Sequence, residues 1–302
     1  MKQLQLAVIG FGTLGRACAA AITDDEQLAL AGIVRRTESL TGQIPAHFSR
    51  VPVVSHAREL GPVDAALICV PTGQALATAH DLLQHRTPIV ECATLHDKAF
   101  REHHDELNRI ASQHGVPAIV GAGWNPGVLS LFRALFALLT PKGHTSTSWH
   151  TAASLHHTSA ASAIHGVREA LSTELRTVDG KLQRYVYVEL EKGGDLAGIE
   201  AAIRSDPLFL GEETLVFPVE DIRIMVEEGH GVLLERRGSA AATDHQIFTL
   251  EARYSEQALT AAVMTAAARA IPTCSRGAFS LLDLPLGSLW GNLNKKAQQE
   301  WL

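Results

Sequence analysis

The feature that most constrains the fold of this chain is a glycine-rich turn near its start, within AVIGFGTLGRA (residues 7–17). Gly10, Gly12 and Gly15 follow an apolar run that is typical of a buried strand, and they precede a helical pattern. This context and the G-x-G-x-x-G spacing predict a dinucleotide site: the first glycine permits a tight turn, the second lets a pyrophosphate approach the backbone, and the third lets the helix pack on the strand. A glycine turn without a ligand is the alternative. The other residues expected at this site are Phe11, Thr13 and Leu14.

The pattern of apolar residues changes along the chain, which indicates two domains. Over the first 120 residues, near-continuous apolar strands alternate with helices, which predicts a parallel sheet covered on both faces. Later segments such as YVYVEL (185–190) alternate apolar and polar residues with few helices between them. We therefore expect an α/β protein: a Rossmann-type doubly wound parallel sheet in residues 1–123, completed by residues 258–302, and a second α+β domain in residues 124–257.

Composition and charge favour a small molecule as the partner. The chain has 302 residues, a net charge of −6 and dispersed Lys and Arg residues, which argues against nucleic acid. It has no apolar run near the ~20 residues that span a bilayer, so we expect no membrane partner. Its first residues lead directly into the glycine turn instead of a cleavage site, so we expect a cytoplasmic protein. The four cysteines form no C-x-x-C pair, and the histidines between His144 and His165 match no tight ligand motif, so a metal enzyme is the least favoured alternative and we expect no metal.

The residues after the second predicted strand, in LAGIVRR (30–36), indicate which dinucleotide binds. An NAD site would place a carboxylate about 20 residues after the glycines, where it accepts a hydrogen bond from the ribose 2′-hydroxyl. Arg35 and Arg36 stand there instead, and two guanidiniums can pair with a 2′-phosphate. The predicted cofactor is therefore NADP(H), and two solvated arginines are the alternative.

The next two predicted strands end in ICVPT (68–72) and ECAT (91–94). Ligands of doubly wound sheets lie beyond the carboxyl ends of the strands. We expect the following residues to line the ribose and the nicotinamide: Cys69, Val70, Pro71, Thr72, Cys92 and Ala93. A buried thiol at a strand end is more often a packing residue than a nucleophile, so neither cysteine is assigned a chemical role.

A second motif, GWNPG (123–127), follows the last strand expected in the first domain. Asn125 is a good N-cap and Pro126 suits the first turn of a helix, so the motif can be explained by structure alone. Its position at the end of that strand would also place the Trp124 indole at the crevice between the domains, which makes Trp124 a candidate substrate contact.

Taken together, these residues resemble the meso-diaminopimelate D-dehydrogenase family. The segments that carry the resemblance stand in family-like order along nearly the whole chain: VIGFGTLGR, LAGIVRR, GWNPG, YVYVEL, IRSDPLF, ETLVF, GHGVLLERRG and ALTAAVM. The resemblance implies an NADP-binding Rossmann domain completed by the C-terminal segment, a substrate-binding and dimerisation domain, and a homodimer. It also implies reversible oxidative deamination at the D-centre of an amino-acid substrate.

The same resemblance shows where this chain departs from the family. Two family carboxylates hold the ammonium group at the reacting centre, and Asn125 and Thr94 stand at their positions. Leu155 and His156 replace a Met-Gly-like pair that grips the reacting-end carboxylate, while His157 is retained. The residues implied at the distal L-centre carboxylate are Arg184, His230, Glu174 in place of a threonine, and Ser255 or Glu256 in place of an asparagine.

These departures predict a changed substrate. Oxidation of an amine by hydride transfer needs a cationic group near the nicotinamide, and carboxylates stabilise that cation and relay its proton. The first hypothesis is therefore an NADP(H)-dependent oxidoreductase that acts on another amino acid, imine or keto acid and is inefficient on meso-diaminopimelate. Its candidate catalytic residues are Asn125, His156 and His157, because histidine titrates near neutral pH. The second hypothesis is a catalytically inactive NADP-binding paralogue that serves as a sensor or partner protein.

Overall fold

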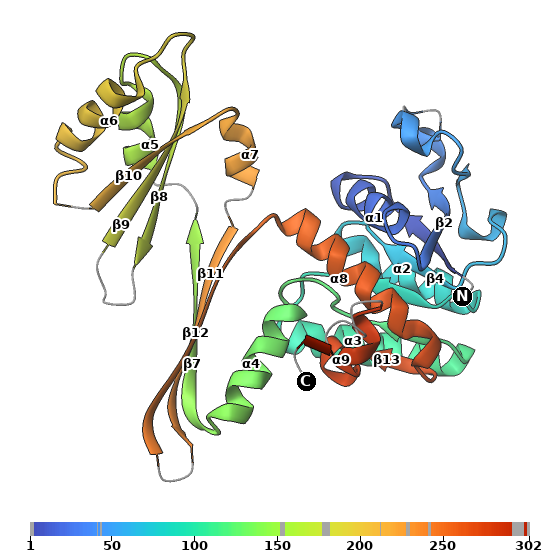
Figure 1. Cartoon of the computed structure of the whole chain (residues 1–302). Helices are drawn as coiled ribbons and strands as arrows, with labels where there is room; N and C mark the ends of the chain where they lie inside the picture. Colours follow the sequence, from blue (N-terminus) through green and yellow to red (C-terminus); the bar gives the residue numbers. More distant parts are fainter. Residues whose placement is uncertain are drawn as a thin grey trace. The chain divides into compact units, whose positions relative to one another are not determined.

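The chain folds into two compact units, seen in a computed structural model that describes residues 3–40, 42, 44–151, 155–176, 182–211, 213–227, 230–240, 243–291 and 299–300. The first unit consists of Met1–Leu138 and Gln257–Leu302, and the second consists of Leu139–Glu256 (Figure 1). The first unit is therefore discontinuous in sequence.

The first unit is built on a seven-stranded sheet in which every pairing is parallel. Its strands are β1 (Leu4–Ile9), β2 (Leu28–Val34), β3 (Val53–Val54), β4 (Ala65–Ile68), β5 (Ile89–Glu91), β6 (Pro117–Ile119) and β13 (Gly277–Phe279), in the spatial order β13-β6-β5-β4-β1-β2-β3. The strand order reverses between β1 and β4, which is the position where doubly wound sheets bind their ligands. The predicted Rossmann-type fold is confirmed.

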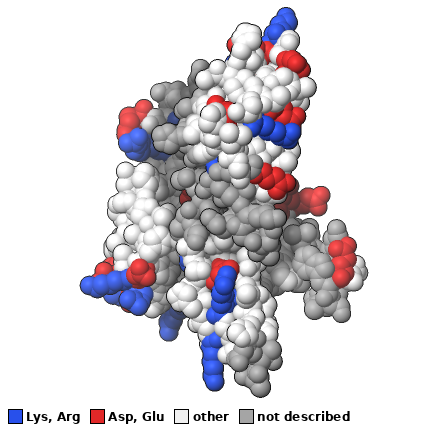
Figure 2. All heavy atoms as spheres, turned by 90° about the vertical axis from the view of Figure 1, so that its left-hand side faces the viewer, with Lys and Arg blue, Asp and Glu red and all other residues white. Residues whose placement is uncertain are grey.

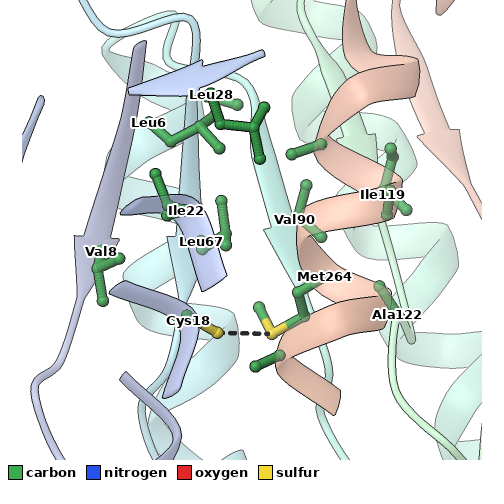
Figure 3. Close-up of a cluster of buried hydrophobic side chains, with 14 of the residues drawn as sticks. Leu6, Val8, Cys18, Ile22, Leu28, Leu67, Val90, Ile119, Ala122 and Met264 are labelled. Carbon is green, nitrogen blue, oxygen red and sulfur yellow. Dashed lines mark hydrogen bonds between the residues drawn. The ribbon is translucent and has the colours of Figure 1, made fainter. Parts of the chain in front are cut away.

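Helices cover both faces of this sheet. They are α1 (Thr13–Thr23), α2 (Thr72–Gln84), α3 (Asp97–His114), α4 (Val128–Leu139), α8 (Glu256–Ala270) and α9 (Leu286–Leu289), with short 3-10 turns at Thr37–Ser39, Ala46–Phe48, Ala57–Glu59, Ile271–Thr273 and Leu281–Asp283. Alternate residues of β1 belong to different cores: Leu6 and Val8 pack with α1 and α8, and Ala7 and Ile9 pack with α2 and α3. Figure 3 shows the first of these cores, where Cys18 Sγ lies 4.0 Å from Met264 Sδ.

The boundary between the units differs from the expected one. We expected the second domain to begin at residue 124, but the first unit continues to Leu138 and includes most of α4. The physical reason is the apolar face of α4: Leu129 is fully buried, and Val128 and Leu131 pack against the same core as α1 and α8.

The second unit contains two three-stranded sheets. One is antiparallel, in the order β12-β11-β7, and consists of β7 (Lys142–Thr151), β11 (His230–Ala240) and β12 (Thr243–Tyr254). The other is mixed, in the order β10-β9-β8, and consists of β8 (Val167–Arg176), β9 (Leu182–Leu190) and β10 (Glu213–Val219). The helices of this unit are α5 (Leu155–Ser162), α6 (Leu196–Ser205) and α7 (Ile222–Glu227). An α+β architecture was predicted for this part of the chain.

The surface carries charges of both signs. On the face shown in Figure 2, the described Lys and Arg side chains lie interspersed with Asp and Glu. No helix among the described residues has both the length and the apolar character that crossing a membrane requires.

Candidate active site

The glycine turn between β1 and α1 has the geometry of a dinucleotide cradle. Gly10 adopts a φ of +91°, and a Cβ at this position would lie 2.7 Å from the Cys69 carbonyl oxygen. A Cβ on Gly15 would collide with the Gly10 carbonyl oxygen, so close packing of α1 on β1 requires glycine here. A Cβ on Gly12, by contrast, would meet no protein atom within 4 Å. Gly12 thus faces open space at the start of α1, whose first turn has no acidic residue, and this space fits an anionic group.

The ends of β4 and β5 lie on the same side of the sheet as this cradle, because β4 pairs with β1 and β5 pairs with β4. Cys69, Val70 and Pro71 follow β4, and Thr72 begins α2. Cys92, Ala93 and Thr94 follow β5, and the Thr94 backbone N–H donates to Thr72 Oγ1 at 3.2 Å. The carboxyl ends of parallel strands share one edge of the sheet, so the structure gathers these predicted cofactor residues at the switch point.

Arg35 and Arg36 follow β2 directly, as predicted, but they differ in surroundings. Arg35 Nη1 donates to the Gly42 carbonyl oxygen at 3.1 Å, and its guanidinium carbon lies 5.9 Å from the centre of the Phe11 ring. Phe11 in turn packs edge-on against the buried Phe48, with ring centroids 5.7 Å apart. Arg36 is mostly exposed and its Nε lies 3.5 Å from Glu38 Oε1. The Arg35 guanidinium thus contacts two neutral groups, the Gly42 carbonyl and the Phe11 ring, whereas Arg36 lies beside a carboxylate.

Glu91, a residue that sequence reasoning did not single out, links the loops after β5 and β6. Its side chain is 1% exposed. Oε2 accepts a hydrogen bond from the Ala93 N–H at 2.6 Å, and Oε1 accepts one from the Gly121 N–H at 2.9 Å. His103 Nε2 lies 3.5 Å from Oε1. The sequence feature that could have pointed to Glu91 is its place as a lone carboxylate in the apolar strand PIVECAT, because a buried charge requires hydrogen-bonding partners.

The GWNPG motif forms a closed turn, not the start of a helix. Gly123 and Gly127 bridge, and the Val128 and Leu129 N–H groups donate to the carbonyl oxygens of Gly123 and Trp124 at 3.0 and 2.9 Å. The predicted N-cap role of Asn125 and the first-turn position of Pro126 are wrong, because α4 begins only at Val128 and the closed turn supplies its first acceptors. The Asn125–Pro126 peptide bond is cis. The Trp124 side chain is 6% exposed, so it is packed within the unit.

Asn125 lies beside a cavity of about 240 Å³ within the first unit. Asn125 Oδ1 accepts a hydrogen bond from Arg133 Nη1 at 3.1 Å, and both residues line the cavity together with His96, Asp97, Ser130 and Ser280. Partial burial lowers the pKa of Arg133 from its usual range. The cavity therefore combines a cationic side chain, a carboxamide, hydroxyls and one carboxylate.

The thiols near the cradle are packing groups. Cys69 Sγ donates to Cys18 Sγ at 3.6 Å, and this hydrogen bond together with burial raises the pKa of the Cys69 thiol well above its usual range. A protonated thiol is a weak nucleophile, which supports the interpretation made from sequence. Among the described residues, no three His, Cys, Asp or Glu side chains are grouped so that they could hold a metal ion.

The second unit holds the residues implied for the far end of the substrate. Arg184 on β9 is 1% exposed and its Nη1 donates to Ser172 Oγ at 3.3 Å. Its register partners are Glu174 on β8 and Thr214 on β10. His230 begins β11, and Ser255 follows β12. The side chains of Glu174 and His230 lie outside the described part of the structure.

Helix α5 carries the two candidate catalytic histidines. His157 Nε2 lies 2.9 Å from the Leu208 carbonyl oxygen, so this nitrogen carries the hydrogen, and its ring packs edge-on against Phe209. The side chains of Leu155 and His156, at the start of α5, also lie outside the described residues.

The cradle, the switch point and the arginine after β2 define a dinucleotide-dependent oxidoreductase with a Rossmann domain. In agreement with this, residues 4–122 match the model of an oxidoreductase family with an NAD-binding Rossmann fold. The chain is also 34% identical to the meso-diaminopimelate D-dehydrogenase of Bacteroides fragilis over 286 residues, which cover 95% of each chain. It therefore belongs to the meso-diaminopimelate D-dehydrogenase family, and the resemblance stated from sequence is confirmed.

Two solved structures share the fold over the whole chain. A Corynebacterium glutamicum diaminopimelate dehydrogenase in complex with diaminopimelate matches with a TM-score of 0.67 at 22% identity, covering 100% of both chains. An engineered D-amino acid dehydrogenase bound to NADP+ matches with a TM-score of 0.65 at 21% identity, again covering 100% of both chains.

Proposed function

We propose that this protein is an NADP(H)-dependent oxidoreductase that acts on the C–N bond of an amino acid, an imine or a related keto acid. The observation that carries the proposal is the cradle, in which Gly12 faces open space at a helix N-terminus while Gly10 and Gly15 leave no room for a Cβ. Such a cradle fits a pyrophosphate. The B. fragilis relative is a D-dehydrogenase of an amino acid, which supports the C–N bond as the site of reaction.

The choice of NADP over NAD rests on Arg35. Its guanidinium is held against the Phe11 ring by the bond to Gly42, directly after the strand that would face the adenosine ribose. A pre-positioned guanidinium can bind a phosphate with two parallel hydrogen bonds. The engineered relative bound to NADP+ supports the same choice.

The chemistry proposed for this chain differs from that of a diaminopimelate enzyme at the reacting amine. A bound nicotinamide cofactor supplies or accepts a hydride. Asn125 and Thr94 are neutral, so they cannot pair with an ammonium group as two carboxylates would, which costs about 3–5 kcal/mol when the site is desolvated. We therefore propose that turnover of meso-diaminopimelate is weak or absent.

The residues of the second unit are proposed to bind the rest of the substrate. Arg184 and His230 would pair with its distal carboxylate, with Glu174 and Ser255 beside them. Leu155 would contact the reacting end, and His156 or His157 would supply the proton. His157 Nε2 donates to the Leu208 carbonyl oxygen, so Nδ1 is the nitrogen proposed to exchange that proton.

The proposal is tested by following NADPH oxidation with a panel of 2-keto acids, each with ammonia or a primary amine. Turnover of at least one pair with NADPH, and weaker turnover with NADH, is expected. Intact NADPH binding without turnover across the panel would indicate the inactive paralogue instead. The double variant N125D/T94D should gain activity on meso-diaminopimelate, and no gain would contradict the account of the lost ammonium site.

The resemblance to the family also leads us to propose a homodimer that works in the cytoplasm. Sedimentation equilibrium of the purified protein and fractionation of the source cells test these two points.

A further inference from the structure

The hydrogen bond between Arg133 and Asn125 fixes the orientation of a carboxamide at the reacting end of the proposed site. A guanidinium has only donors, so the Asn125 atom 3.1 Å from Arg133 Nη1 must be the carbonyl oxygen. The other branch of the planar carboxamide is then the NH₂ group. Among the residues that the structure describes, Asn125 Nδ2 has no hydrogen-bond acceptor in the protein.

This orientation changes what position 125 can recognise. A carboxylate accepts hydrogen bonds on both oxygens, so it can bind Arg133 with one oxygen and a substrate ammonium with the other. A carboxamide whose oxygen is committed to Arg133 offers a ligand two N–H donors and no acceptor. An ammonium group, which has three donors and no acceptor, finds no partner there.

The neighbouring cavity agrees with a ligand that accepts hydrogen bonds. It measures about 240 Å³, and its lining includes the Arg133 guanidinium and the Ser130 hydroxyl, both of which can donate, whereas the Ser280 hydroxyl already donates to Asp283 Oδ2 at 2.7 Å. The same lining includes the Asp97 carboxylate, which is exposed on the first turn of α3. The charged side chain of the lining that lies beside Asn125 itself is the Arg133 guanidinium, which has donors and no acceptor.

We propose that Arg133 is a positioning residue that holds Asn125 with its NH₂ group toward the substrate. The site then binds a 2-oxo acid, the carbonyl form of the substrate, more tightly than the matching amino acid. This inference rests on the proposed function and specifies its substrate class. Asn125 donates to the carbonyl or carboxylate oxygen of the 2-oxo acid, where the family's aspartate would accept from an amine.

The test compares ligand pairs that share a carbon skeleton: pyruvate with D-alanine, and 2-oxoglutarate with D-glutamate. Binding is measured by calorimetry in non-reacting combinations, the oxo acids with NADP+ and the amino acids with NADPH. The wild-type protein should bind each oxo acid more tightly than its amino acid. N125D should weaken oxo-acid binding by about 10- to 100-fold, the range expected when a hydrogen bond to a charged group is replaced by repulsion, and should tighten amino-acid binding.

Two variants of Arg133 separate positioning from structure. R133M frees the carboxamide to rotate and should reduce the oxo-acid preference, whereas R133K keeps a donor for Asn125 Oδ1 and should retain most of it. N108D is the matched control: Asn108 Oδ1 accepts from the Ala278 N–H at 3.0 Å, aspartate keeps that acceptor, and residue 108 does not line the cavity. Its binding preference should equal that of the wild type.

Some results would overturn the inference while leaving the proposed function intact. Equal affinity of the wild type for an oxo acid and its amino acid would do so, as would a change of both affinities in the same direction in N125D. If R133M does not fold, the N125D and R133K measurements still decide the matter. Failure of the wild type to bind NADPH would instead contradict the proposed function.

Discussion

Substitution of Gly12 by alanine separates the role of the cradle in binding from its role in folding. Gly12 has φ −76° and ψ −159°, which alanine adopts freely, and a Cβ there meets no protein atom within 4 Å. Alanine lowers the entropy of the unfolded chain, worth about 0.4–1 kcal/mol, but it is a poorer N-cap than glycine by roughly 0.5 kcal/mol. The two effects nearly cancel, so the melting temperature of G12A should stay within about 2 °C of the wild type.

Cofactor binding should respond very differently. The new methyl group occupies the space proposed for the pyrophosphate and would break at least one hydrogen bond between a backbone N–H and a phosphate oxygen. Such a bond to a charged group is worth about 1.5–3 kcal/mol, so the dissociation constant for NADPH should rise about 10- to 100-fold. At a concentration 100 times the wild-type constant, NADPH should stabilise the wild type by about 2.7 kcal/mol and a 100-fold weaker variant by only about 0.4 kcal/mol.

The matched control is Gly15→Ala. Its Cβ would collide with the Gly10 carbonyl oxygen and lie 3.4 Å from Val8 Cγ1 inside the core. Overpacking of this kind costs about 1–3 kcal/mol, so G15A should melt roughly 3–10 °C lower without any cofactor present. Fluorescence titration with NADPH measures the dissociation constants of both variants, and thermal unfolding without cofactor measures their melting temperatures. Wild-type NADPH affinity in G12A, or a G12A melting temperature as low as that of G15A, would refute the reasoning.

Three further outcomes are expected. R35A should weaken NADPH binding about 10-fold or more with little change in NADH binding. R36A should change the affinity for either cofactor by less than about 3-fold, because Arg36 is exposed and already paired with Glu38. Fluorescence titrations of both variants with NADPH and with NADH measure these affinities. E91Q should destabilise the protein by about 1–3 kcal/mol in denaturant unfolding, because an NH₂ group would face one of the two backbone N–H donors; an unchanged midpoint would contradict this. The raised pKa of Cys69 keeps its thiol protonated at neutral pH. Its alkylation by iodoacetamide should therefore be slower at pH 8 than that of free cysteine, and should accelerate only as the pH rises toward the raised pKa. Peptide mass spectrometry measures the rate.

Local patterns in the sequence predicted the features of the fold that depend on neighbouring residues. The glycines of the first turn, the end of β2 before Arg35 and the burial of β1 on both faces all follow from backbone freedom and from a continuous apolar strand. These features need no information from distant parts of the chain.

The features that sequence missed depend on contacts between distant residues. Glu91 bonds to Gly121, 30 positions away, and no local pattern encodes that pairing. The N-cap role of Asn125 was wrong because the bridge between Gly123 and Gly127 closes a turn whose shape capping preferences do not describe. The bond from Arg133 to Asn125 spans eight residues across that turn, so helical spacing could not suggest it.

The discontinuity of the first unit has a consequence for how the chain is made. Residues 139–256 form the second unit as one continuous stretch, so everything that it needs has emerged from the ribosome before α8 is synthesised. The first unit, by contrast, must wait with part of one face of its sheet uncovered, because Met264, Ala267 and Ala268 of α8 complete the core that α1 begins. A fragment that ends at residue 138 would lack these α8 side chains, so part of this apolar core would stay exposed to water.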